Sequence, residues 1–235
     1  MRLCHEAVQK ARTLTSTADW TAIKVQPLGV RAIARLSGRA FVGPSINRNK
    51  EWIDTSINYA IHVFIAAVKL QFFPEWMRPV GQYLVSELRQ TRRDVARARA
   101  MVQPIIEERL REKDNPEFER PDDFCQWLLD TLPEAEKRDY QSQAELQLIL
   151  SAASIHTTSN LLADCIFDLA AHPEAQEELR REVAEVLNGD GAWARKDSMV
   201  RLKKMDSFIK EVQRLSGNIS KWAPPRQRWS PAQLR

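Results

Sequence analysis

The chain has 235 residues, of which 43% are hydrophobic and 28% are charged, so it is long enough for one large domain or two small ones with an apolar core. The formal net charge is +4, but acidic and basic residues alternate through most of the chain, which argues against a nucleic-acid-binding protein. Cys4, Cys125 and Cys165 lie far apart without metal-ligand spacing, which favours free thiols in a reducing compartment and predicts no metal site.

Only seven glycines occur, and period-2 alternation of β-branched residues is rare, so a mainly helical protein is expected. Pro27-Leu28-Gly29 is interpreted as a turn between two short helices, and residues 38–49 as a loop. Pro104 is expected to bend a long charged helix, because proline removes a backbone donor. In the first half of the chain, helices are predicted over residues 2–13, 19–26, 30–36, 51–70 and 80–113.

In the second half, Asp122 or Asp123 is predicted to cap a short helix over residues 123–131. A long apolar helix is expected over 142–171, ending before Pro173. Amphipathic helices follow over 173–187 and 205–215. Residues 216–235 contain three prolines, two tryptophans and no acidic residue, and are interpreted as a disordered basic tail.

Two stretches, residues 59–73 and 148–171, are the most apolar in the chain. Each carries polar or charged side chains, among them Lys69 and Asp168, so both are interpreted as buried helices and not as membrane spans. The N-terminus has no apolar leader segment. The sequence therefore predicts no transmembrane segment in this chain.

A polar cluster interrupts the long apolar helix at SAASIHTTSN, residues 151–160. Ala153, Ser154 and Thr157 lie three or four residues apart and share one face, where a ligand can approach the backbone. Thr157 is expected to donate a hydrogen bond to the carbonyl of Ala153. In the competing interpretation the hydroxyl groups only satisfy the helix backbone, and His156 contacts a carboxylate on another helix. Periodicity leaves both interpretations open.

Several segments, in their order and spacing, resemble fungal cytochrome P450 monooxygenases of secondary metabolism. The segments that carry this resemblance are RLSGRAFVGPSINRNKEWIDTSINYA, FFPEWMRPV, SAASIHTTSNLLADCIFDLAAHPEAQEELRREVAEVL and GDGAWARKDSMVRLKKMDSFIKEVQRLS. The resemblance implies a mainly α, incomplete P450 helical fold, comprising the central helices through the Glu-x-x-Arg helix. It predicts a partial P450-like domain over 1–215 and a divergent tail over 216–235.

The resemblance also implies roles for the polar cluster, because the family's long helix crosses the distal face of the haem. Ala153 and Ser154 would line the oxygen groove, although Ser154 departs from the usual glycine or alanine. His156 would replace the family's acidic residue. Thr157 would supply the hydroxyl that helps deliver protons during oxygen activation, a form of acid catalysis.

Glu211 and Arg214 match the family's Glu-x-x-Arg pair, which is a buried ion pair on the proximal side of the haem pocket. Spacing alone is weak evidence, because the same interval recurs elsewhere in the chain and usually marks a surface pair. The preceding stretch LKKMDSFIKE distinguishes this pair. By resemblance, its role is structural.

Haem is the cofactor that the resemblance implies, and NADPH-cytochrome P450 reductase is a possible partner. The family holds iron through a cysteine in a Phe-x-x-Gly-x-x-x-Cys context, and none of the three cysteines has that context. The chain is therefore interpreted as a truncated P450-like protein that is catalytically inactive, with Thr157 and His156 as relics.

Two alternatives remain open: a non-enzymatic helical interaction protein, and a fragment of a longer, active P450 from an incomplete gene model. The expected location is the cytoplasm or the surface of the endoplasmic reticulum membrane, since the family is membrane-anchored.

Overall fold

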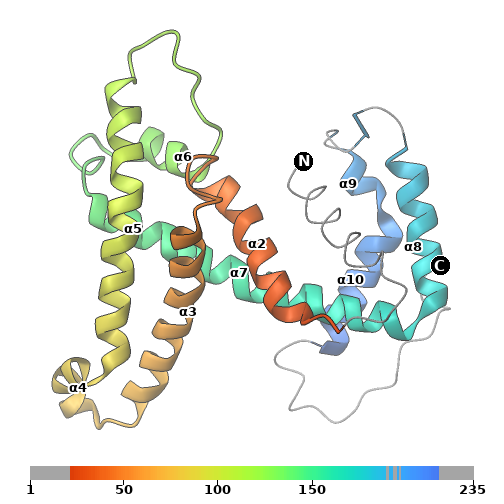
Figure 1. The fold of residues 1–235 in the computed structure, drawn as a ribbon, viewed down its shortest axis with the longest axis horizontal. Coiled ribbons are helices and arrows are strands. Elements are labelled where there is room, and N and C mark those ends of the chain that lie inside the picture. The colour runs from red at the N-terminus through yellow and green to blue at the C-terminus, as the bar shows by residue number, and fades with distance from the viewer. Residues whose placement is uncertain (1–21, 189–190, 193–194, 196, 217–235) are drawn as a thin grey trace. The chain divides into compact units, whose positions relative to one another are not determined.

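The computed structural model describes residues 22–188, 191–192, 195 and 197–216. Within these residues all regular elements are helices, which confirms the mainly α class (Figure 1). They are α2 (Val25–Phe41), α3 (Lys50–Gln71), the 3-10 helix η1 (Glu75–Met77), α4 (Arg78–Leu84), α5 (Ser86–Arg111), α6 (Phe124–Thr131), α7 (Tyr140–Ala171), α8 (Pro173–Val186), α9 (Ser198–Arg201) and α10 (Lys203–Ser216).

The chain divides into two compact units. The central unit contains Pro27–Ser159, and the terminal unit combines Met1–Gln26 with Asn160–Arg235. Helix α7 contributes residues to both units, with the change at Ser159. The predicted boundary at residue 215 stays a prediction, because the tail from residue 217 lies outside the described residues. The helix expected over residues 2–13 also lies outside them.

Five predicted helices are confirmed to within a few residues at each end. They are α3, α6, α7, α8 and α10, for which the sequence predicts 51–70, 123–131, 142–171, 173–187 and 205–215. The N-cap of α6 is Asp123, whose side chain accepts a hydrogen bond from the backbone of Gln126, as predicted. Helix α9 was not predicted, because four residues are too short to show a period.

The turn predicted at Pro27-Leu28-Gly29 is wrong. Residues 22–24 are not helical, and one helix, α2, runs from Val25 through all three residues to Phe41. Proline is tolerated in a first helical turn because the backbone donor that it lacks has no intrahelical partner there. Gly29 is buried, so the packing of α2 against the rest of the protein outweighs the low helix propensity of glycine.

The single helix predicted over 80–113 is also wrong. Its beginning falls in α4, and the chain is extended at Val85, with φ −74° and ψ 111°, before α5 begins at Ser86. Val85 is buried, and a β-branched side chain readily adopts this extended conformation. Helix α5 continues through Pro104.

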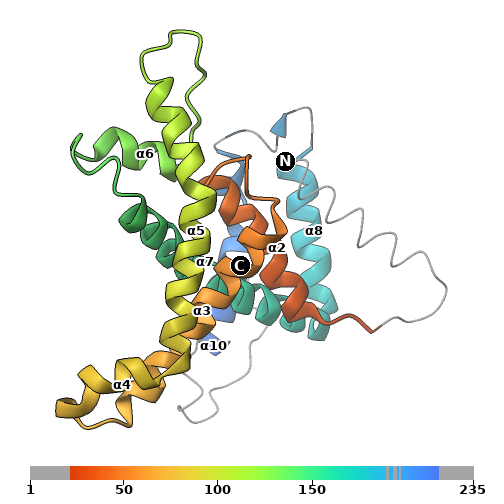
Figure 2. The same cartoon turned by 60° about the vertical axis from the view of Figure 1, so that its left-hand side comes forward.

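The core of the central unit lies where α3, α5, α6 and α7 meet. Helices α3 and α5 run antiparallel beside one another, joined through η1 and α4, as Figures 1 and 2 both show. Trp52, Ile106 and Leu148 are among the fully buried side chains of this core. Burial of apolar surface, worth about 25 cal/mol per Å², is the main stabilising contribution here.

Two smaller clusters contain residues of α7, one at the middle of the helix and one near its C-terminal end. In the central unit, Ile155 packs with Val30 and Ile53, so that α7 contacts α2 and α3. In the terminal unit, Cys165 packs with apolar residues of α8 and α10. Glu182 accepts hydrogen bonds from the backbone of Lys204 (2.7 Å) and Met205 (2.9 Å), and so caps the start of α10.

Candidate functional site

Helix α7 presents Thr157 on an exposed face. The hydroxyl Oγ1 donates a hydrogen bond to the carbonyl oxygen of Ala153 at 2.6 Å, which confirms the predicted contact. Ala153 is also exposed and Ser154 is half-buried, so the small side chains leave the backbone of this turn accessible. The Thr157 hydroxyl donates its proton to a backbone carbonyl of the helix, so its oxygen lone pairs remain available to accept a hydrogen bond.

His156 lies on another side of the same turn and is half-buried. Its Nε2 lies 3.1 Å from the carbonyl oxygen of Ile57 in α3. A carbonyl oxygen only accepts, so Nε2 is the donor of this hydrogen bond. The prediction that His156 contacts a neighbouring carboxylate is therefore wrong, because the backbone of α3 reaches the imidazole first.

An apolar stripe continues from Thr157 toward the start of α7. Leu146, Ile149, Ala153 and Thr157 follow one another at intervals of three or four residues, so they share one face, and all are exposed. The stripe combines two large aliphatic side chains with a small one beside the hydroxyl.

Glu211 and Arg214 form an ion pair on α10, in which Arg214 Nε donates to Glu211 Oε2 at 2.8 Å. The hydrogen bond from Arg214 holds the pKa of Glu211 below its usual range. Arg214 is exposed and Glu211 is half-buried, so the pair lies at the surface of the terminal unit. This differs from the buried pair that the resemblance implies, and the structural role of these residues stays a prediction.

The two described cysteines, Cys125 and Cys165, are buried free thiols. Burial raises the pKa of Cys125 to about 11, and burial is also the main cause of the raised pKa of Cys165. A raised pKa favours the neutral thiol over the thiolate, which is the form that binds metals. Cys4 lies outside the described residues. Cys165 lies in the apolar cluster of the terminal unit.

No three His, Cys, Asp or Glu side chains are grouped closely enough to hold a metal ion, as far as the described residues extend. Over the same residues, no helix is sufficiently long and apolar to cross a membrane.

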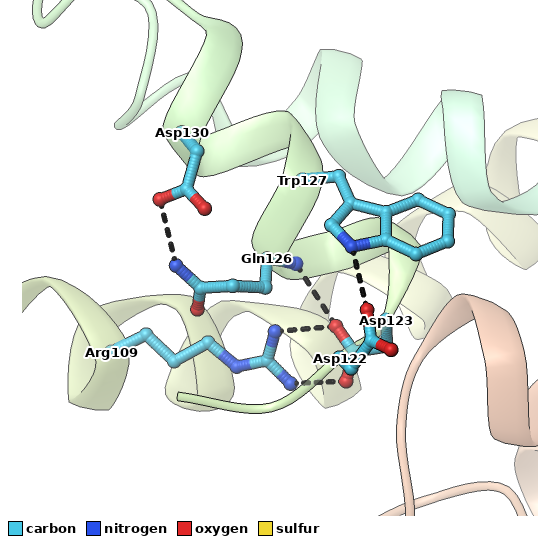
Figure 3. A network of polar contacts seen from close by, with 6 residues as sticks. All are labelled: Arg109, Asp122, Asp123, Gln126, Trp127 and Asp130. Carbon is cyan, nitrogen blue, oxygen red and sulfur yellow. Dashed lines mark hydrogen bonds and ion pairs between the residues drawn. The ribbon is translucent and has the colours of Figure 1, made fainter. Parts of the chain in front are cut away.

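A buried ion pair outside the predicted site joins α5 to the start of α6. Arg109 donates to both carboxylate oxygens of Asp123, at 2.6 and 2.7 Å, and the two side chains are 4% and 0% exposed (Figure 3). The sequence analysis did not identify this pair. A signal was present, because Arg109 continues the buried face of α5 formed by Ala98, Val102 and Ile106.

A second pair links α3 to α5, where His62 Nδ1 lies 2.6 Å from Asp94 Oδ2. The Asp94 side chain is almost fully buried, and Arg97 approaches its other oxygen at 3.6 Å. Asp94 lies four residues before Ala98 on the buried face of α5, which was the corresponding signal in the sequence. Both pairs lie within the central unit, where one joins α5 to the start of α6 and the other joins α3 to α5.

The cytochrome P450 family model matches residues 4–226 of this chain. With a described structure made of helices and a long central helix that carries the Ala-Ser-Ile-His-Thr-Thr segment, this chain belongs to the cytochrome P450 family.

Individual fungal proteins that are similar to this chain support the same family assignment. Cytochrome P450 monooxygenase AN1598 of Emericella nidulans is 39% identical over 202 residues, covering 84% of this chain and 37% of the relative. Cytochrome P450 monooxygenase olcJ of Penicillium canescens is 38% identical, covering 84% and 38%. Cytochrome P450 monooxygenase adrA of Penicillium rubens is 36% identical, covering 86% and 39%. The chain spans less than two fifths of the length of these relatives.

Haem, the cofactor of this family, fits the described residues on one side only. The exposed stripe of Leu146, Ile149 and Ala153 beside Thr157 suits one apolar face of a porphyrin. Neither Cys125 nor Cys165 fits as the axial ligand, because each thiol is enclosed in a core and has a raised pKa.

Proposed function

We propose that α7 is the oxygen-side helix of a fungal cytochrome P450 monooxygenase, and that Thr157 is its hydrogen-bonding group. The observation that carries this proposal is the exposed Thr157 hydroxyl, bonded to Ala153 at 2.6 Å and placed at the end of an apolar stripe. In such enzymes the haem supplies the oxygen chemistry when bound, and the protein orients groups around it.

Three residues of α7 have different tasks in this proposal. Thr157 accepts a hydrogen bond from a polar ligand while its own proton is held by Ala153. The side chains of Ala153 and Ser154 are small, so a ligand can approach the backbone of this turn of α7. His156 fixes the helix against the Ile57 carbonyl, which positions Thr157 one residue further on. His156 therefore serves as a positioning residue.

We further propose that these 235 residues, by themselves, do not form the haem-thiolate complex. The support is the enclosure of Cys125 and Cys165, whose raised pKa values oppose thiolate formation. Electron supply by NADPH-cytochrome P450 reductase and a site at the endoplasmic reticulum surface belong to the same proposal, through the family.

A reduced-CO difference spectrum tests the haem proposal. The purified 235-residue chain is incubated with haemin, reduced and exposed to CO, beside the Cys125→Ala and Cys165→Ala variants. We expect no thiolate-type Soret band in any sample. A thiolate-type band in the unmodified chain would contradict the proposal, and its loss in one variant would identify the ligand.

The monooxygenase proposal has its own test at the level of the gene. Genomic DNA downstream of codon 215 is translated in all three forward frames. A frame with a Phe-x-x-Gly-x-x-x-Cys segment supplies the protein in which Thr157→Val is measured. There we expect lower substrate oxidation and more peroxide release, with Thr157→Ser close to unmodified protein. Equal coupling in all three proteins would contradict the role of Thr157.

A further inference from the structure

Helix α7 buries two glutamines in the core of the central unit. Gln143 and Gln147 are 2% and 0% exposed, and they lie four residues apart on one face. Their neighbours Ala144 and Leu148 belong to the main apolar cluster of this unit. Neither glutamine has a part in the proposed function, so their burial needs another explanation.

The hydrogen bonds of these side chains are incomplete within the described residues. Gln143 Nε2 donates to the carbonyl oxygen of Lys137 at 2.7 Å, but its Oε1 has no partner there. Gln147 has no partner among the described residues at either Oε1 or Nε2.

An unpaired amide in an apolar core is costly, because it has lost its hydrogen bonds to bulk water. Folded proteins satisfy such groups with a protein partner or with an ordered internal water. An internal water needs two to four polar partners in a cavity that can hold it. Gln147 supplies an acceptor and a donor, and Gln143 supplies a second acceptor on the same helix face.

The chemistry of these groups selects the ligand. A metal cation requires acceptors only, and an anion requires donors only, whereas this set offers neutral groups of both kinds. We propose that Gln147 and Gln143 bind one or more internal water molecules in the core of the central unit. The water donates to the glutamine oxygens and accepts from Gln147 Nε2.

Unfolding experiments on the full 235-residue chain test the proposal. Gln147→Met keeps the approximate volume but removes both polar ends, and we expect a lower urea midpoint, because the water loses its partners and Gln143 Oε1 is left unpaired. Gln141→Met is the matched control, since Gln141 is exposed on the same helix and bonds to Glu145. An unchanged or higher midpoint for Gln147→Met would overturn the proposal, since removing an unhydrated amide stabilises the core.

The double variant Gln143→Met/Gln147→Met separates a shared water from two independent effects. When both glutamines hold the same water, the second substitution shifts the midpoint by less than it does alone. Additive shifts would overturn a shared site.

A measurement on the unmodified protein decides the question even where a variant fails to fold. Glutamine side chains are labelled with ¹⁵N, and cross-relaxation between water and the amide protons is recorded. A long-lived water gives a cross-peak of slow-tumbling sign at a protected glutamine amide. Its absence at every slowly exchanging glutamine amide would overturn the proposal.

Discussion

Asp123 combines two contacts at the first residue before α6. Its Oδ1 accepts from the backbone of Gln126 at 2.9 Å, which caps the helix, and also from Arg109 Nη1. Burial has the largest single effect on the pKa of Arg109 and lowers it, but the hydrogen bond to Asp123 and the nearby acidic groups together outweigh burial, so the net pKa is raised. The arginine therefore stays charged inside the core, and Figure 3 shows the bidentate geometry that holds it.

Substitution of Asp123 by asparagine is predicted to destabilise the protein strongly. The variant leaves the buried guanidinium of Arg109 without its counter-charge, which costs about 3–5 kcal/mol. Asp122→Asn is the control, because Asp122 is exposed and accepts a hydrogen bond from Trp127 Nε1. We expect a loss below about 1 kcal/mol there. Similar losses in urea unfolding for both variants would show that the ion pair is unimportant.

Cys125 is predicted to make stability fall at alkaline pH. Burial raises the pKa of the thiol from 9.0 to about 11 in the folded chain. The neutral thiol is favoured by folding, so this contribution is complete below pH 9 and is lost as the pH rises toward 11. Two pKa units correspond to at most about 3 kcal/mol.

The measurement for Cys125 is the difference in unfolding free energy between pH 8 and pH 10.5. The unmodified chain should lose more stability over this interval than Cys125→Ala, which has no thiol to ionise at this site. Parallel pH curves for the two proteins would refute the prediction.

At the scale of elements, the connection from α2 to α3 depends on Gly43. Its φ of 79° lies in the left-handed region, and an added Cβ would lie 2.4 Å from Asp123 Oδ2. The connection therefore passes directly beside the buried ion pair that links α5 to α6. Only a glycine permits both the backbone conformation and this close approach.

Gly43→Ala is predicted to destabilise the central unit through both conformational strain and steric overlap. Gly191→Ala provides a matched control, because Gly191 also has a positive φ, 73°, but nothing within 4 Å of an added Cβ. The control should lose about 1 kcal/mol from strain alone. Gly43→Ala should lose clearly more in the same unfolding assay. Equal losses would mean that the approach to Asp123 is loose enough to relax.

For the molecule as a whole, large apolar side chains remain exposed near the end of α3. Phe72 is 83% exposed, and Trp76 in η1 is 78% exposed. Phe64 in α3 is also largely exposed, and exposed aromatic side chains of this size favour association in solution. These exposed side chains are the surface through which the isolated chain is expected to associate.

We predict concentration-dependent self-association of the isolated chain through this surface. Light scattering after size-exclusion chromatography should show a rising apparent mass, which falls in Phe72→Ser/Trp76→Ser. Val200→Ser is the control, since Val200 is similarly exposed but lies in the terminal unit. A monomer at all concentrations, with one cooperative thermal transition, would refute the prediction.

The positions of most helices were predictable because local patterns determine them. The apolar period of α3, the proline after α7, and the amphipathic faces of α8 and α10 each act within a few residues. The bond from Thr157 to Ala153 spans a single helical turn, so the sequence alone predicts it. The family assignment likewise depends on the order of these segments.

Tertiary contacts decided the remaining features, since their partners lie far apart in the sequence. The His156 imidazole binds a carbonyl 99 residues away, and the Arg109–Asp123 pair spans a connection between two helices. Neither partner can be selected from local periodicity, because many carbonyls and carboxylates satisfy the same chemistry. Packing also allowed α2 to continue through Pro27 and interrupted the helix at Val85. The sequence alone determined the family and the positions of five helices. The tertiary structure decided the continuity of α2, the break before α5 and which buried polar groups meet, because burial leaves each of those groups only the partner within reach.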